Sequence, residues 1–424
     1  MFNRPHYIPR NRRQNLSKYK YSGEDHSIVS KYVLTPYWNR LVTYFPMNMA
    51  PNLITLTGLG FVLINFGSLL IFEPSLECSI KPTHVSRGLW IYQSLDAIDG
   101  KQARRTGTSG PLGEMFDHGC DALNTTLGCI LASGALNLGQ SWWTVSSQVA
   151  SLANFYLTTW EEYHTGTLYL SSFSGPVEGI LLVIGVFLIT SVFGWCPGFW
   201  DQGILTVTGL NSIGFIKSLH LKDLPLNECS LLFAIISLGS NTVGSYFNVV
   251  KARKGKGGSN LSTLLGLLPF VIQTVVNLIW LKTAPMILNR HLILFMIYYG
   301  IGFAYLVGLL IVSHITLSPE LFPYWNLLLI WSCFGMMDSV SGNMLGWKTL
   351  FHSDELSSVR FLWFSILVET LVYGYFVFDV ILDVCDYFQI NCLTIKHQGQ
   401  RLGNTRKEQE SLVDKKKSSK QKSK

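Results

Sequence analysis

Four aspartates in otherwise apolar sequence are the feature that most constrains this chain. Asp96 and Asp99 are three residues apart, and Asp117 and Asp121 are four apart; on a helix, each pair shares one face. Ionisable groups near a bilayer are costly to bury, so they usually mark a functional site. Two divalent cations would neutralise four carboxylates, and Mg²⁺ prefers carboxylate oxygen while leaving positions open for phosphate. The pattern therefore favours a metal site over two ordinary acidic helix ends.

The composition is that of a membrane protein. Of 424 residues, 48% are hydrophobic and 14% are charged, whereas a soluble chain carries about 25% charged residues. A span needs about 20 apolar residues. Ten such runs are found, at 53–72, 85–105, 113–136, 143–160, 177–195, 229–250, 261–281, 292–313, 323–345 and 361–382. We expect an all-α integral membrane protein with about ten transmembrane helices.

Basic residues predict how the helices are oriented. With ten spans and a cytosolic N-terminus, the cytosolic segments hold 25 of the 33 Lys and Arg residues, as expected when positive charge stays in the cytosol. Both termini and the acidic cluster would then face the cytosol. Residues 27–45 predict an amphipathic helix lying in the interface and kinked near Pro36. The side chains on one side of it are Ile28, Tyr32, Leu41, Val42 and Phe45.

The chain divides into four predicted parts. Residues 1–50 form a cytosolic N-terminal segment, 51–250 the catalytic helices, and 251–390 additional transmembrane helices. Residues 391–424 are basic and poor in aromatics, which predicts a disordered cytosolic tail. Its lysines are explained by membrane orientation and anionic lipid, so we expect the lipid bilayer as partner and no nucleic acid. The eight cysteines show no C-x-x-C spacing, and suggest neither a zinc site nor a disulfide framework.

The acidic region resembles the signature of the CDP-alcohol phosphotransferase family (class I). The matching positions are Asp96, Asp99, Gly100, Ala103, Arg104, Gly113, Asp117 and Asp121. The wider chain is similar to the eukaryotic cholinephosphotransferase and ethanolaminephosphotransferase branch, through residues 49–55, 100–105, 111–121 and 160–179. The resemblance implies transfer of phosphocholine or phosphoethanolamine from CDP-choline or CDP-ethanolamine to 1,2-diacylglycerol. CMP would be released, and phosphatidylcholine or phosphatidylethanolamine formed.

The resemblance also assigns the metal ligands. Asp96 and Asp117 would bridge two Mg²⁺ ions, with Mn²⁺ as an alternative, while Asp99 ligates one ion and Asp121 the other. In phosphoryl transfer a protein mainly positions the reactants and neutralises charge. The bound ions would therefore hold the diphosphate and stabilise the departing CMP.

Four further residues are candidates for binding the CDP-alcohol. Gly100 and Ala103 project no bulky side chain, so a nucleotide could approach the helix backbone there; close helix packing is the alternative. Arg104 can hold a phosphate with two hydrogen bonds, and an orientation charge is its alternative role. By resemblance, Asn52 donates to the CDP moiety; otherwise it only begins a helix.

The attacking hydroxyl must lose its proton. Glu114 and His118 are four residues apart and share a helix face. A carboxylate that holds one imidazole nitrogen raises the basicity of the other. We therefore expect His118 to be the general base and Glu114 to orient it. Asp121 is the competing base, and a purely structural His118 is the other alternative.

Several alternatives stay open. Glu161, Glu162 and His164 could line the donor's entry or form a hydrated helix end. The enzyme could use a different alcohol, or the acids could serve a cation-coupled transporter, although no second copy of the motif indicates the repeats of such transporters. The sequence does not separate choline from ethanolamine. A multi-pass protein of the endoplasmic reticulum or Golgi is implied by the resemblance, and the aromatic-rich later helices could form a homodimer interface.

Overall fold

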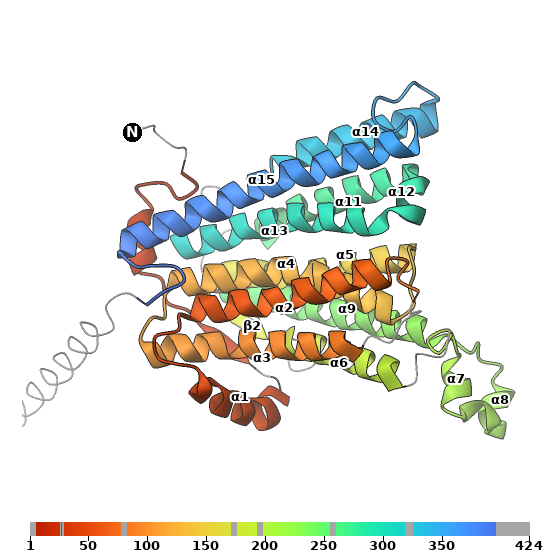
Figure 1. Ribbon diagram of the computed structural model, residues 1–424, viewed down its shortest axis with the longest axis horizontal. Helices are drawn as coiled ribbons and strands as arrows, with labels where there is room; N and C mark the ends of the chain where they lie inside the picture. The colour runs from red at the N-terminus through yellow and green to blue at the C-terminus, as the bar shows by residue number, and fades with distance from the viewer. Residues whose placement is uncertain are drawn as a thin grey trace, which may run out of the picture.

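The chain folds into a bundle of long helices whose axes are roughly aligned with one another (Figure 1). The computed structural model describes residues 6–25, 27, 29–77, 83–170, 176–192, 198–254, 260–318 and 325–395. The long helices are α2 (Pro51–Phe72), α3 (Thr83–Thr106), α4 (Pro111–Ala135), α5 (Trp142–Thr165), α6 (Pro176–Val192), α9 (Leu226–Arg253), α11 (Leu268–Thr283), α13 (Leu292–Thr316), α14 (Leu328–Leu345) and α15 (Glu355–Phe388).

Short elements precede α2 or lie between the later long helices. They are η1 (Arg13–Ser17), η2 (Ser30–Leu34), α1 (Thr35–Leu41), η3 (Val42–Tyr44), α7 (Ile204–Val207), η4 (Leu210–Ser212), α8 (Gly214–Ser218), α10 (Asn260–Leu264), η5 (Leu265–Leu267) and α12 (Pro285–Arg290). Helices α7 and α8 project from one end of the bundle (Figure 1).

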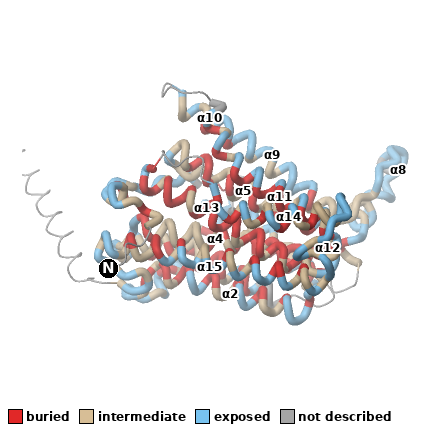
Figure 2. Tube along the Cα trace, turned by 90° about the horizontal axis from the view of Figure 1, so that it is seen from above, coloured by how far each residue is buried: buried red, intermediate tan, exposed pale blue. Residues whose placement is uncertain are grey.

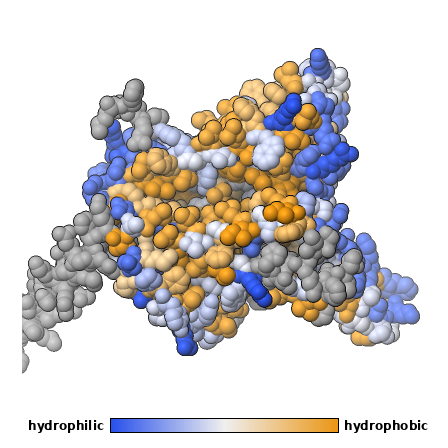
Figure 3. Space-filling view, viewed as in Figure 1, coloured by the Kyte–Doolittle hydropathy of each residue, from blue (hydrophilic) through white to orange (hydrophobic). Residues whose placement is uncertain are grey.

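The predicted fold class is confirmed. The ten predicted ranges coincide largely with helices, with 261–281 shared among α10, η5 and α11. Residues 193–195 and 323–324 of two ranges lie outside the described residues, and α14 begins only at Leu328. Among the described residues, α2, α9, 262–283, α13 and α15 are long and apolar enough to cross a membrane. Helices α3 and α4 carry the four aspartates and are therefore less apolar. On the face seen in Figure 3, hydrophobic atoms gather over the middle of the bundle and hydrophilic ones toward its ends, which suits a membrane protein.

Helix α13 lies at the centre of the core. It packs against α4, α5 and α15, and most of its residues are buried (Figure 2). Small residues permit this close packing, since a Cβ on Gly300 would lie 2.4 Å from Oγ1 of Thr126 in α4. Helices α2 and α3 also pack together, so α2, α3 and α4 form a fixed group around the acidic residues.

The N-terminal segment, residues 6–25, crosses the end of this bundle. The backbone N–H of Tyr7 donates to Asp379, and Arg13 Nη2 lies 2.7 Å from Oδ1 of Asp383, both carboxylates being on α15. Strand β1 (Gly23–Asp25) then pairs in parallel with β2 (Leu168–Leu170). These three-residue strands are a small addition to the all-α fold.

The predicted interfacial helix is built from η2, α1 and η3, and α1 begins at Thr35 with Pro36 in its first turn. Its protein-facing side differs in part from the expected apolar side. Leu34, Trp38 and Val42 are buried against α2 and α3, whereas Tyr32 is exposed. The reason is that a helix resting on the bundle buries positions four residues apart, and the sequence alone does not show which apolar stripe meets the protein.

The start of the predicted tail is packed against the catalytic helices. Thr394 forms a β-bridge with Met49, just before α2 begins. Residues 396–424 lie outside the described residues. The segment 391–395 therefore belongs to the folded bundle, at the same end as the N-terminal segment.

Candidate metal centre and substrate cavity

A short turn between α3 and α4 brings the two aspartate pairs together. Helix α3 ends at Thr106, and Gly107 follows with a φ of 68°, a left-handed conformation that glycine adopts without strain. Pro111 then begins α4, where a missing backbone N–H costs nothing. The chain thus reverses within a few residues, and the two acidic faces meet.

Three of the four aspartates converge on one point. Asp96, Asp117 and Asp121 each offer a carboxylate oxygen, and these oxygens lie within 4.8 Å of one another. Oδ1 of Asp96 and Oδ1 of Asp117 are buried and have no hydrogen-bond partner among the described residues. Buried acceptors without a donor are costly, and like charges this close repel. These three carboxylate oxygens therefore fit as ligands of a divalent cation.

Thr55 and Tyr92, which were not predicted from the sequence, hold the carboxylates of Asp99 and Asp121. The Thr55 hydroxyl on α2 donates to Oδ2 of Asp99, and the Tyr92 hydroxyl on α3 donates to Oδ1 of Asp121. Ligating carboxylates are commonly fixed by such outer hydrogen bonds. The sequence indicates these two residues only weakly, through their spacing. Thr55 follows Asn52 by three residues and Tyr92 precedes Asp96 by four, so each lies one helical turn from a predicted site residue.

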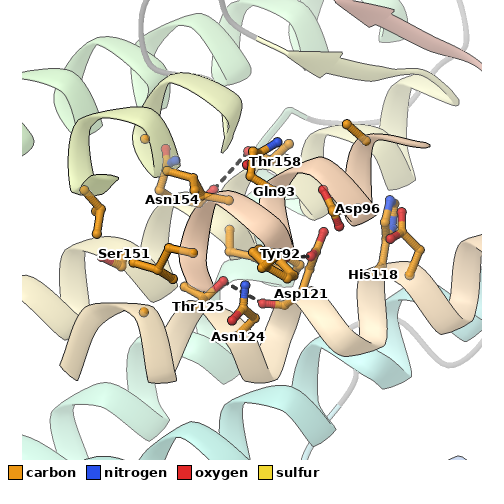
Figure 4. A pocket seen from close by; sticks show the side chains of 18 of the residues that line it. Tyr92, Gln93, Asp96, His118, Asp121, Asn124, Thr125, Ser151, Asn154 and Thr158 are labelled. Atoms are coloured by element: carbon orange, nitrogen blue, oxygen red, sulfur yellow. Dashed lines mark hydrogen bonds between the residues drawn. The ribbon is translucent and has the colours of Figure 1, made fainter. Parts of the chain in front are cut away.

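All ten predicted site residues line one cavity of about 1360 Å³. They are Asn52, Asp96, Asp99, Gly100, Ala103, Arg104, Glu114, Asp117, His118 and Asp121. Figure 4 shows part of this cavity, with Asp96, Asp121 and His118 near one another. The structure thus brings the predicted residues to one place, and their individual roles stay predictions.

Among the four candidate nucleotide residues, Gly100 leaves open space beside α3. A Cβ added to Gly100 would meet only Nη1 of Arg104, at 3.7 Å. Lys20 and Lys101 line the cavity as well, so cations accompany the carboxylates. The side chain of Asn52 donates to the carbonyl oxygen of Cys392, at 3.1 Å. This bond ties the segment after α15 to the cavity wall.

A second cluster lies beside the four aspartates. One ligand atom from each of Glu114, His118 and Glu162 lies within 4.8 Å of the others. Among the described residues, no hydrogen bond joins Glu114 to His118; instead the Tyr19 hydroxyl donates to both carboxylate oxygens of Glu114. Nε2 of His314 lies 4.0 Å from Oε1 of Glu162. His118 therefore lies near the carboxylates of Glu114 and Glu162. The hydrogen bond that fixes the orientation of Glu114 comes from Tyr19 and not from His118.

The N-terminal segment supplies two tyrosines to this region. Burial, and then the neighbouring Glu114 carboxylate, raise the pKa of Tyr19. Burial, followed by Glu162 and Glu114, raises the pKa of Tyr21 to about 12. Both hydroxyls therefore keep their protons at neutral pH, and Tyr19 acts as a donor to Glu114. Neither tyrosine was found from the sequence, because Tyr19 is 95 residues away from Glu114.

The cavity extends from the aspartates to an apolar wall. Helices α6 and α9 line it with Leu182, Val183, Val186, Leu231 and Phe233. Leu182 and Phe233 are 52% and 49% exposed. The cavity is therefore bounded by accessible apolar side chains on α6 and α9. A polar substrate and a lipid could meet inside it.

The fold and the site define a class, a multi-pass membrane protein in which carboxylates that could hold a metal ion line a cavity that also has an apolar wall. Residues 48–210 match the family model described as CDP-alcohol phosphatidyltransferase. An uncharacterised CDP-alcohol phosphatidyltransferase class-I family protein of Schizosaccharomyces pombe is 42% identical, over 91% of this chain and 97% of its own length.

Two relatives with assigned activities come from Saccharomyces cerevisiae. Its cholinephosphotransferase 1 is 33% identical, and its choline/ethanolaminephosphotransferase 1 is 34% identical; each match covers 92% of this chain and 98% of the relative. The chain belongs to the CDP-alcohol phosphotransferase family. It is a membrane-bound transferase, as the resemblance implied.

Proposed function

We propose that this transferase moves phosphocholine, phosphoethanolamine or both from the CDP ester to 1,2-diacylglycerol, in the endoplasmic reticulum or Golgi membrane. The observation that carries the proposal is that four aspartates, Arg104 and an apolar wall all line one cavity. The names of the two yeast relatives support the choice of donor and product.

In the proposed reaction, the free hydroxyl oxygen of diacylglycerol attacks the β-phosphorus of the CDP-alcohol. The bond from that phosphorus to the bridging oxygen breaks, and CMP leaves with the electron pair. Asp96, Asp99, Asp117 and Asp121 would hold two Mg²⁺ ions, which when bound neutralise the diphosphate. Arg104 holds a phosphate oxygen through its guanidinium group. Gly100 and Ala103 leave room for the nucleotide along α3.

His118 takes the hydroxyl proton in this proposal. Asp121 is the weaker candidate, because its Oδ1 already accepts a hydrogen bond from Tyr92. Glu114 lies close enough to His118 to stabilise the imidazolium that forms, and Tyr19 fixes the Glu114 carboxylate. Because general bases contribute about 10²- to 10⁴-fold, loss of His118 should lower turnover by a factor in that range.

The two substrates would enter from different sides. The donor is soluble and charged, so it would reach the aspartates from the cytosolic end, where Lys20 and Lys101 line the cavity. The acceptor is a lipid and would enter from the bilayer near α6 and α9, where the accessible apolar side chains of Leu182 and Phe233 line the cavity.

The proposal is tested with the purified full-length protein in lipid nanodiscs. Diacylglycerol is supplied with CDP-choline or CDP-ethanolamine, and CMP and phospholipid are measured with Mg²⁺, with Mn²⁺ and with a chelator. We expect CMP and phospholipid to form in equal amounts. Formation of both products should stop on chelation and in a variant carrying both Asp96→Asn and Asp117→Asn. The same double change at two exposed aspartates that do not line the cavity, Asp201→Asn with Asp386→Asn, is the control. Synthesis that survives chelation, or no product from either donor, would overturn the proposal.

A further inference from the structure

Two buried amides lie just deeper in the cavity than the metal centre. Gln93 precedes Asp96 by three residues on α3, and Asn124 follows Asp121 by three on α4. At a helical rise of about 1.5 Å per residue, each amide is about 4.5 Å further from the turn that joins the two helices. Both side chains line the cavity, and Figure 4 places them with Asp96 and Asp121.

These amides have unused hydrogen-bonding capacity. Gln93 is 3% exposed and Asn124 7% exposed, and Oε1 of Gln93 and Oδ1 of Asn124 have no partner among the described residues. A buried polar atom without a partner costs about 1–3 kcal/mol. The oxygen and nitrogen of an amide exchange places by a simple flip. Each residue can therefore offer either a donor or an acceptor to a bound molecule.

The position of the two amides indicates which substrate they meet. The cationic residues that suit a diphosphate, Lys101 and Arg104, lie toward the end of α3, on the other side of Asp96. Beside the amides lie the polar side chains of Ser151, Asn154 and Thr158 (Figure 4), and beyond them the cavity is lined mainly by apolar or small side chains, including Leu89, Cys129, Ala132, Leu136 and Val186. A molecule here must be largely apolar and carry a few hydrogen-bonding groups.

We propose that Gln93 and Asn124 bind the ester carbonyl groups of diacylglycerol. This inference rests on the proposed function and adds the residues that recognise the acceptor. An amide N–H donates to each ester carbonyl, the acyl chains extend along the apolar wall, and the free hydroxyl points back toward the aspartates and His118. The subsite thereby sets the depth at which the acceptor stops.

The test compares two acceptors and two variants in the full-length protein. Dialkylglycerol has the same hydroxyl and chains as diacylglycerol but has ether oxygens in place of the ester carbonyls. We expect the wild-type protein to prefer the diester. Gln93→Leu and Asn124→Leu should each raise the KM for the diester by about three- to tenfold, the effect of one hydrogen bond. The KM for the CDP-alcohol should stay unchanged, and the double variant should no longer distinguish ester from ether.

Asn277→Leu is the matched control. Asn277 is a buried amide on α11 that also lacks a partner among the described residues, but it does not line the cavity. The Asn277→Leu variant should leave the KM for the diester and the KM for the CDP-alcohol unchanged. If a leucine variant fails to fold, Gln93→Met keeps the volume nearly constant, and the ester-to-ether comparison in the wild-type protein needs no variant.

Three results would overturn the inference. They are equal use of ester and ether by the wild-type protein, a raised KM for the CDP-alcohol in the variants, and an ester preference that survives in the double variant. Absence of CMP release in the wild-type protein is a different result, because it refutes the proposed function itself.

Discussion

Replacing Tyr92 by phenylalanine tests whether the carboxylate centre is a metal site tuned by its neighbours. The Tyr92 hydroxyl, in a side chain only 2% exposed, donates to Oδ1 of Asp121 at 2.5 Å. A hydrogen bond to a charged group is worth about 1.5–3 kcal/mol, and about 1.4 kcal/mol corresponds to a tenfold change in an equilibrium constant. Loss of outer hydrogen bonds at metal sites typically costs about 10- to 100-fold in affinity.

We therefore expect Tyr92→Phe to raise the Mg²⁺ concentration needed for half-maximal CMP release by about 10- to 100-fold. Activity should largely return at saturating Mg²⁺, because the phenyl ring fills the same space. The Mg²⁺ concentration that gives half of the maximal rise in Tm should shift in parallel, which measures binding without catalysis.

The matched control is Tyr298→Phe. Tyr298 is equally buried, and its hydroxyl lies 2.6 Å from that of Ser332, between α13 and α14 and away from the cavity. This variant should lower stability without changing the Mg²⁺ requirement. An unchanged requirement in Tyr92→Phe, or an equal change in both variants, would refute the reasoning.

Three further changes probe the same site. Thr55→Val removes the donor to Asp99 and should also raise the Mg²⁺ requirement about tenfold or more; an unchanged titration curve would contradict this. His118→Ala should lower kcat by about 10²- to 10⁴-fold while donor binding, measured by calorimetry, stays nearly intact; near-normal turnover would exclude the histidine. Tyr19→Phe removes the donor to Glu114 and should lower kcat by about tenfold with an unchanged donor KM; a change confined to the donor KM would assign Tyr19 to substrate binding instead.

The acidic centre could be predicted because its geometry is local. Asp96 and Asp99 share one helix, Asp117 and Asp121 share the next, and Gly107 and Pro111 define the turn between them. Helical spacing then fixes which carboxylates face the same side. The ten helical ranges were predictable for a similar reason, because apolar runs of spanning length leave the backbone little choice but to form helix.

The partners of the centre could not be predicted, because they depend on how distant segments pack. Thr55 reaches Asp99 from α2, across 44 residues, and Tyr19 reaches Glu114 from the N-terminal segment. The stripe of α1 that meets the bundle, with Trp38 at its centre, is set by the surface of α3 and not by its own sequence. The strands β1 and β2 are too short to leave a pattern in the sequence.

The hydrogen bond from Asn52 to Cys392 has a consequence for biosynthesis. The two residues are separated by 340 positions, so the ribosome must complete every described helix before this contact to a cavity-lining residue can form. The aspartate-bearing helices enter the membrane early, yet this contact forms only as translation finishes. A chain that stops short of residue 392 keeps all four carboxylates and still lacks the carbonyl group that holds the Asn52 side chain.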